Sequence, residues 1–384
     1  MKKTTVTFKD NDSYPCKLAI FNDFNCKLDS GYTLNDFQLA FQTYGRLNQD
    51  KSNAILILHA LTGDQFVAEE HPITKKNGWW SRMVGENKPI DTNKYYVLCI
   101  NVLGGCIGST GPKEKNLKTN KQYGVEFPAI TIKDMVKVQK YLIDALEIKK
   151  LFAVIGASMG AMQVLQWVID YPEKILNAIH IAGALKHSTQ NIAFHEVGRQ
   201  AIMSDPSWHK GNYIKMNTKP ERGLAVARMI AHITYLSEEA FQRKFGRNLQ
   251  NKLSLAYDFK TDFQVESYLK HQGQAFVDRF DANSYLYITR AMDYFDLPSQ
   301  KKGGLKNIYK NTPVKFCVIS FTSDWVYPTK YSKEIVDSLN AVGANVSFVE
   351  IETDKGHDAF LLDEQEFNET VKGFLRATAN EINL

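Results

Sequence analysis

Apolar runs alternate with helical patterns along most of the chain. Six runs are rich in β-branched and aromatic residues and end close to a Gly, Ser, Asp or His, a pattern typical of strands in a parallel sheet covered on both faces. They occupy residues 54–60, 95–104, 151–158, 175–183, 314–325 and 346–357. Helical patterns lie between several of them, as in 131–148 and 330–343, and Gly343 closes the second as a C-terminal cap. This alternation predicts an α/β fold with a mostly parallel sheet, helices on both faces and right-handed crossovers.

Two segments depart from the alternation. Residues 185–305 carry helix-like patterns and no convincing buried strand, so we expect a helical lid that excludes water from the sheet crevice and shapes a substrate pocket or tunnel. A separate helical domain without a catalytic role is the alternative. Residues 15–48 alternate polar and apolar positions, which predicts antiparallel edge strands. We therefore divide the chain into a core domain, residues 1–184 and 306–384, and a lid domain, residues 185–305.

Composition places few limits on the chemistry. With 384 residues, 44% of them hydrophobic, the chain can build a substantial core, and a formal charge of +5 without a basic block does not indicate a nucleic-acid surface. The five cysteines are scattered without a CxxC pair, which fits reduced thiols better than disulfides or a zinc site. The N-terminus does not resemble a signal peptide, and no apolar run approaches membrane-spanning length. We expect a cytoplasmic protein without a metal ion or membrane anchor.

The stretch GASMG, residues 156–160, fits the pattern G-x-S-x-G between an apolar run and a helical pattern. A nucleophile at such a strand-to-helix elbow adopts strained dihedrals, and its neighbours must be small to avoid the helix and the adjacent strand. The start of the helix also provides free N–H groups beside the serine oxygen. We predict that Ser158 is a nucleophile. A tight turn without chemistry is the alternative.

A serine hydroxyl needs a general base and a group that orients the base. Asp324 and His357 each follow a predicted strand, so both should face the crevice that holds Ser158. The chain order Ser, Asp, His is that of the α/β-hydrolase fold. We predict that His357 moves the serine proton and that Asp324 fixes the imidazole tautomer. Taken singly, His357 is equally well a loop histidine and Asp324 a turn cap.

An oxyanion forms when a serine attacks a carbonyl, and this fold stabilises it with two backbone N–H groups. The first follows the nucleophile and belongs to Met159. We assign the second to Leu61, in the loop HALTGD at residues 59–64. His59 is a competing candidate base, but it lies on a different loop from the expected base and precedes the serine, so we interpret it as structural.

Several longer motifs match a known family. They are HALTGD (59–64), NGWWSRMVGENKPIDTNKYYVLCINVLGGCIGSTGP (77–112), GASMGAMQVLQW (156–167), ARMIAHITYLS (227–237), SDWVYP (323–328) and GHDAFL (356–361). Together they resemble the homoserine O-acetyltransferase family, in the family's order and over most of the chain. The resemblance implies an α/β-hydrolase core with a helical lid, a homodimer associating through the lid, and acyl transfer from acetyl-CoA to L-homoserine in methionine biosynthesis. Acetyl-CoA is then a co-substrate, and no cofactor is permanently bound.

Carried over position by position, the resemblance repeats the assignments of Ser158, Asp324, His357, Leu61 and Met159. It adds Arg228 as the residue that binds the homoserine carboxylate, for which the planar guanidinium is suited, and Asp358 as the residue that holds the ammonium group. A lid salt bridge for Arg228 and a solvated turn for Asp358 are the alternatives.

The sequence also departs from the family pattern. Ala157 and Ala161 stand where the family usually has glycines, and Leu236 replaces a common arginine. We expect the extra methyl groups to narrow the acyl pocket. Acetyl-CoA or succinyl-CoA as donor, and homoserine or serine as acceptor, remain open on the sequence alone. A carboxylic-ester hydrolase with the same triad is the main competing function, followed by an inactive binding or scaffold protein, against which the complete triad argues.

Overall fold

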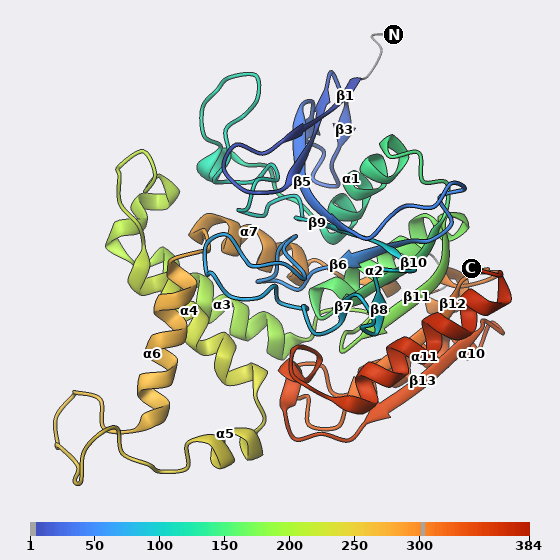
Figure 1. The fold of residues 1–384 in the computed structure, drawn as a ribbon. Helices are drawn as coiled ribbons and strands as arrows, with labels where there is room; N and C mark the ends of the chain where they lie inside the picture. Colours follow the sequence, from blue (N-terminus) through green and yellow to red (C-terminus); the bar gives the residue numbers. More distant parts are fainter. Residues whose placement is uncertain (1–4, 301–303) are drawn as a thin grey trace.

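A nine-stranded sheet is the main feature of the computed structural model, which describes residues 5–300 and 304–384 (Figure 1). Its strands are β1 Thr5–Asp10, β2 Lys17–Asn22, β5 Phe37–Tyr44, β6 Ala54–Leu58, β9 Tyr96–Ile100, β10 Leu151–Ala157, β11 Ile175–Ile181, β12 Lys315–Phe321 and β13 Val346–Ile351. They lie in the order β1-β2-β5-β9-β6-β10-β11-β12-β13. Two small ribbons lie outside this sheet, β3 Cys26–Lys27 with β4 Thr33–Leu34 and β7 Val84–Gly85 with β8 Ile90–Asp91.

The strand directions confirm the predicted fold class. From β9 to β13 every neighbouring pair is parallel, whereas β1, β2 and β5 are antiparallel to their neighbours. The six parallel strands are those expected from the apolar runs. They are shorter than the runs because the polar residues that end each run belong to loops. These loops gather at the carboxyl edge of the sheet, where α/β folds place their sites.

Helices cover both faces of the sheet. Successive strand residues point to opposite faces, and β6 accordingly contributes Leu56 to one apolar cluster and Ile57 to the other. The first cluster is completed by α1 (Ile132–Ala145), α2 (Met159–Asp170) and α10 (Thr329–Asn340). The second is completed by α11 (Gln365–Glu381), a helix that the sequence analysis does not identify. Gly343 ends α10 as predicted: its φ is +69°, and Ala344 N donates to Leu339 O at 3.1 Å.

The middle of the chain is helical and lies to one side of the sheet, in green to orange in Figure 1. Its helices are α3 Thr189–Met203, α4 Glu221–Tyr235, α5 Glu238–Lys244, α6 Gln264–Val277 and α7 Ala282–Asp293, followed by the short α8 Leu297–Gln300 and α9 Leu305–Ile308. The α4 helix packs between α3 and α6, and α3 also contacts α7. Within the described part of 185–305 there are isolated bridges but no strand. None of the helices in the described ranges has the length and apolar character needed to cross a membrane.

The junction of β10 and α2 has almost no space for side chains. Ser158 lies there with φ 58° and ψ −121°, a strained conformation for a residue other than glycine. A Cβ atom on Gly160 would overlap the carbonyl oxygen of Leu58 at the end of β6, and one on Gly156 would overlap the carbonyl of Gly160. The two glycines of the G-x-S-x-G pattern therefore allow β6, β10 and α2 to meet.

We expect Gly160→Ala to lower the free energy of unfolding by about 3 kcal/mol or more, because backbone must move to make room for the methyl group. Urea unfolding monitored by fluorescence measures the change. The matched control is Gly373→Ala in α11, where an added Cβ meets no atom within 4 Å. This control should be neutral or stabilising by up to about 1 kcal/mol. Similar urea midpoints for the two variants would contradict the close-approach argument.

Candidate active site

His357 and Asp324 form a buried hydrogen-bonded pair. Asp324 follows β12, and His357 lies in the 3-10 turn Gly356–Leu361 after β13. His357 Nδ1 lies 2.7 Å from Asp324 Oδ2, while Asp324 Oδ1 accepts the N–H groups of Val326 and Tyr327, each at 2.9 Å. Because Asp324 occupies Nδ1, the other ring nitrogen of His357 is the one available for proton transfer. Burial by itself lowers the pKa of His357, but the adjacent Asp324 carboxylate reverses the effect and leaves the pKa above its ordinary value.

Ser158 shares its surroundings with this pair. The cavity at Ser158, which we call the Ser158 pocket, is also lined by Tyr235 and Tyr327. The rings of these two tyrosines lie 5.8 and 5.4 Å from the ring of His357. Within the described ranges, which include both residues, no hydrogen bond joins Ser158 to His357. This does not exclude a catalytic contact, because catalytic hydrogen bonds are often long before substrate binds. The structure thus gathers the three residues at one edge of the sheet.

The two predicted oxyanion donors lie at the same place. A turn closed by the hydrogen bond from Gly63 N to Ala60 O, 2.9 Å, presents Leu61, which lines the Ser158 pocket. Met159 is the first residue of α2, where helix geometry leaves N–H groups without partners. Among the hydrogen bonds of the described residues, none uses the N–H of Leu61 or of Met159. Both groups are therefore available to a ligand oxygen.

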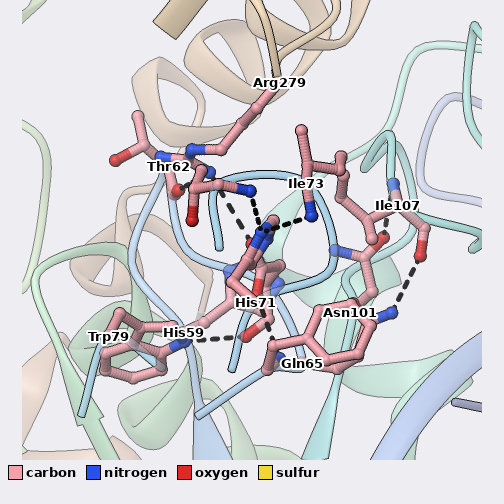
Figure 2. Close-up of polar contacts among 12 residues, drawn as sticks. His59, Thr62, Gln65, His71, Ile73, Trp79, Asn101, Ile107 and Arg279 are labelled. Atoms are coloured by element: carbon pink, nitrogen blue, oxygen red, sulfur yellow. Dashed lines mark hydrogen bonds and ion pairs between the residues drawn. The ribbon is translucent and has the colours of Figure 1, made fainter. Parts of the chain in front are cut away.

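His59 has a structural role. Its Nδ1 lies 2.8 Å from Ala60 O and its Nε2 accepts the N–H of Val102 at 3.1 Å, so both ring nitrogens are used within the fold (Figure 2). Burial lowers the pKa of His59, which keeps the imidazole neutral. The residue ties the loop that carries Leu61 to the segment after β9 and is not available as a base.

Arg228 and Asp358 lie on different elements, and neither lines the Ser158 pocket. Arg228, on α4, donates to Thr62 Oγ1 at 3.3 Å and lies 4.9 Å above the ring of Phe276. Its buried Nε has no hydrogen-bond partner among the described residues. It lines a second cavity of about 230 Å³, which we call the Arg228 pocket. Burial raises the pKa of Asp358, and the charges of His357 and Arg228 oppose that rise. These two charges are close enough to interact with Asp358 but are not ion-paired with it.

Sequence reasoning missed the residues of the helical region that line the Ser158 pocket. His187, just before α3, and His195 on α3 both bond through Nδ1 to Asp293 Oδ1, at 3.1 and 2.9 Å. Arg199 Nη1 lies 2.7 Å from the other oxygen of Asp293, as an ion pair without hydrogen-bond geometry. Burial lowers the pKa of His187 to about 4, which keeps this imidazole neutral. No motif marks these residues, because their contacts arise only when α3 and α7 pack together.

The expectation that Ala157 and Ala161 narrow the acyl pocket is wrong. Neither alanine lines the Ser158 pocket. The Cβ of Ala161 lies 2.6 Å from where a Cβ on Gly183 would stand, so its methyl group fills space beside the end of β11. Ala157 belongs to the apolar cluster on the α11 face of the sheet. A glycine at 183 compensates for the larger residue at 161.

Known proteins resemble the chain along most of its length. A sequence model described as alpha/beta hydrolase fold matches residues 53–364. The homoserine O-acetyltransferase of Rhodospirillum rubrum is 60% identical over 362 residues, which cover 94% of this chain and 93% of that protein. That of Caulobacter vibrioides is 58% identical over 359 residues, covering 93% and 94%.

Solved structures show the same fold. A crystal structure of homoserine O-acetyltransferase from Bacillus anthracis matches with a TM-score of 0.85 at 28% identity, covering 94% of this chain and 97% of that one. Esterase E22 matches with a TM-score of 0.83, also at 28% identity, covering 94% and 100%. Identity of about 60% over nearly the full length of curated relatives, together with this fold, shows that the chain belongs to the homoserine O-acetyltransferase family.

Proposed function

We propose that the protein transfers the acetyl group of acetyl-CoA to L-homoserine, giving O-acetyl-L-homoserine and CoA, a step of methionine biosynthesis. The observation that carries the mechanism is the strained Ser158 at the start of α2, in one pocket with tyrosines that pack against the His357–Asp324 pair. Its relatives at 60% and 58% identity, named homoserine O-acetyltransferase, support the choice of substrates.

In the first half-reaction, His357 takes the proton of the Ser158 hydroxyl while the oxygen attacks the thioester carbonyl. The N–H groups of Leu61 and Met159 stabilise the oxyanion of the tetrahedral intermediate. The C–S bond then breaks, His357 returns the proton to the leaving sulfur, and CoA departs as the thiol. The enzyme is left as an acetyl ester of Ser158.

In the second half-reaction, homoserine replaces CoA. Arg228 binds its carboxylate through the unpaired guanidinium edge, and Asp358 holds its ammonium group. His357 removes the proton from the homoserine hydroxyl, whose oxygen attacks the acetyl carbonyl. The same two N–H groups stabilise this oxyanion, and the proton passes back to Ser158 as the product ester leaves. The two steps give ping-pong kinetics.

The Ser158 pocket favours acetyl over succinyl as the transferred group. None of the described residues that line it is a lysine or arginine. A succinyl group would place its free carboxylate there without a lysine or arginine to pair with it, and an unpaired buried charge is strongly unfavourable.

A carboxylic-ester hydrolase is the second candidate, and the match to esterase E22 is the observation that favours it. Hydrolysis needs the same serine chemistry with water as the acceptor. It has no use for a guanidinium and a carboxylate that hold an amino acid. The positions of Arg228 and Asp358 therefore favour transfer.

The proposal extends to assembly and location. We propose that residues 185–305 form a lid domain through which two copies associate in the cytoplasm. Large apolar side chains exposed on the packed helices α3 and α4, namely Val197, Val226 and Ile233, support a contact between copies there.

Thiol release from acetyl-CoA and succinyl-CoA, each with and without L-homoserine and with L-serine as a control acceptor, tests the function. We expect continuous release only with acetyl-CoA plus homoserine. Ser158→Ala should reduce it by at least about 10³-fold with the fold intact, because the nucleophile is lost. Ser338→Ala, a buried serine in α10, is the control and should retain activity. Turnover that does not depend on an acceptor would indicate a hydrolase, and near-normal turnover of Ser158→Ala would exclude Ser158 from the mechanism.

The pH dependence of acylation tests the His357–Asp324 pair. The base must be neutral, so kcat/KM for acetyl-CoA should rise with pH through the pKa of His357, which Asp324 holds above 6.5. Asp324→Asn removes the charge that raises this pKa. We expect the acidic limb of the profile to move to lower pH while the plateau falls by about 10³–10⁴-fold. A limb that stays in place would show that another group titrates.

Arg228→Ala tests acceptor recognition. Losing charge-assisted hydrogen bonds of about 1.5–3 kcal/mol should lower kcat/KM for homoserine by about 10- to 100-fold, while the rate of acylation by acetyl-CoA changes little. Arg222→Ala, at an exposed position of the same helix, is the matched control. Single-turnover measurements separate the two half-reactions. Equal losses in both would point to a damaged lid and contradict the assigned role.

A further inference from the structure

The loop that carries Leu61 is held by groups from several parts of the chain (Figure 2). On one side, His59 anchors it to Val102 after β9. On the other side, Trp79 Nε1 donates to Asp64 O at 2.9 Å. Between these anchors lies Thr62, the residue after the predicted oxyanion donor. Two arginines of the helical region reach Thr62, and they bind it differently.

Arg279, which lies between α6 and α7, binds the backbone of the loop. Its Nη1 donates to Thr62 O at 2.8 Å and lies 3.6 Å from Asp64 Oδ2 (Figure 2). The guanidinium is largely buried, with 17% of the side chain exposed, and Asp64 is almost completely buried. Thr62 and Arg279 are 217 residues apart in the chain. This contact therefore joins the helical region directly to the loop that carries the oxyanion donor.

Asp64 is itself fixed, which makes it a firm partner for Arg279. His71 Nδ1 accepts the N–H groups of Ile73 and Thr74, both at 3.2 Å, so its proton is on Nε2, which donates to Asp64 Oδ2 at 2.9 Å. Asp64 Oδ1 accepts the N–H of Phe66 at 2.9 Å. Burial alone would raise the pKa of Asp64, but His71 and Arg279 lower it below the ordinary value, so the carboxylate is ionised.

The two arginines differ in what they have left to offer a ligand. Both lie against the ring of Phe276, at 4.9 Å for Arg228 and 5.7 Å for Arg279. Among the described residues, Arg228 forms a hydrogen bond only with the Thr62 hydroxyl and keeps a buried nitrogen without a partner, as expected of a residue that binds a substrate carboxylate. Arg279 is engaged by a backbone carbonyl and a buried carboxylate. Arg279 also lines the Arg228 pocket, but its hydrogen bond and its ion pair are both with residues of the loop that carries Leu61.

We propose that Arg279 is a positioning residue for the oxyanion hole: by holding the Thr62 carbonyl, it fixes the turn that directs the Leu61 N–H toward Ser158. The inference rests on the proposed function, in which that N–H binds the oxyanion. The turn from Ala60 to Gly63 is short and closed by one hydrogen bond, so a peptide rotation at Thr62 is transmitted to Leu61.

Loss of this anchor has a kinetic signature. Both half-reactions pass through an oxyanion, so Arg279→Met should slow acetylation of Ser158 and transfer to homoserine by the same factor. Complete removal of one oxyanion donor typically costs about 10²–10³-fold, and we expect about 10- to 100-fold for a donor that is displaced but present. The KM for homoserine should change by less than about threefold, unlike the effect expected for Arg228→Ala.

The experiment measures rates per active site. A fluorophosphonate that labels the serine counts competent sites, and acetylation is then followed with p-nitrophenyl acetate and with acetyl-CoA, which makes the first readout independent of CoA binding. Arg279→Lys retains one donor and the charge facing Asp64, and should recover part of the lost rate. Arg290→Met is the matched control: Arg290 lies on α7, about half exposed, and should give the wild-type rate.

The double variant Arg279→Met with Asp64→Asn distinguishes loss of loop positioning from the effect of leaving the Asp64 carboxylate without its arginine. If Arg279→Met is slow only because it leaves Asp64 unpaired, adding Asp64→Asn should restore the rate, and that result would overturn the proposal. We expect the double variant to stay slow. A per-site rate of Arg279→Met within twofold of wild type, or a loss confined to the homoserine step, would also overturn it. Failure of the reagent to label wild-type Ser158 would instead refute the proposed function, and this inference with it.

Discussion

The close approach of α2 to the ends of β6 and β10 is the constraint on which the site depends. Gly160 meets the carbonyl of Leu58 with no space for a side chain, and Ser158 is held at φ 58° in the sharp turn before it. Because of this contact, the N-terminus of α2 lies directly beside the loop that follows β6. One packing contact thus brings together Ser158, which we propose as the nucleophile, and the N–H groups of Met159 and Leu61, which we propose as oxyanion donors. The rest of the molecule adds His357, the proposed base, and encloses the Ser158 pocket.

Buried charged side chains near the site fall into two kinds: those that pair with an opposite charge of the protein, and those that have no such partner among the described residues. His357 faces Asp324, Arg279 faces Asp64, and Arg199 faces Asp293, each at 3.6 Å or less. Breaking such a buried pair leaves an uncompensated charge, so these pairs are firm anchors. Arg228 forms no ion pair within the described part of the chain and keeps an unpartnered nitrogen. A substrate carboxylate would supply the missing partner, and for this reason we assign acceptor binding to this arginine.

The sequence predicted the sheet and its edge better than the contacts of the helical region, residues 185–305. The local signals are the alternation of strands and helices, the G-x-S-x-G pattern, and the polar residues after β12 and β13. Because parallel strands end at one edge of the sheet, these signals also place Ser158, Asp324 and His357 near one another. The contacts of His187, His195 and Arg279 depend on how α3, α6 and α7 pack, and no local pattern specifies that. The direction of the Ala161 methyl group was likewise not predictable, because it depends on Gly183 at the end of a different strand. The C-terminal α11 has amphipathic spacing, which the sequence analysis did not use.

The fold by itself does not decide between transfer and hydrolysis. Esterase E22 and the Bacillus anthracis homoserine O-acetyltransferase match the chain at the same identity, 28%, and with nearly equal TM-scores of 0.83 and 0.85. The serine chemistry common to both outcomes belongs to the sheet edge. In the function proposed above, the acceptor is selected by Arg228 of α4 and by Asp358 of the turn that carries His357. In that proposal, the acetylated Ser158 meets the hydroxyl of a bound amino acid held at the reacting carbonyl, and a positioned nucleophile has a large kinetic advantage over free water.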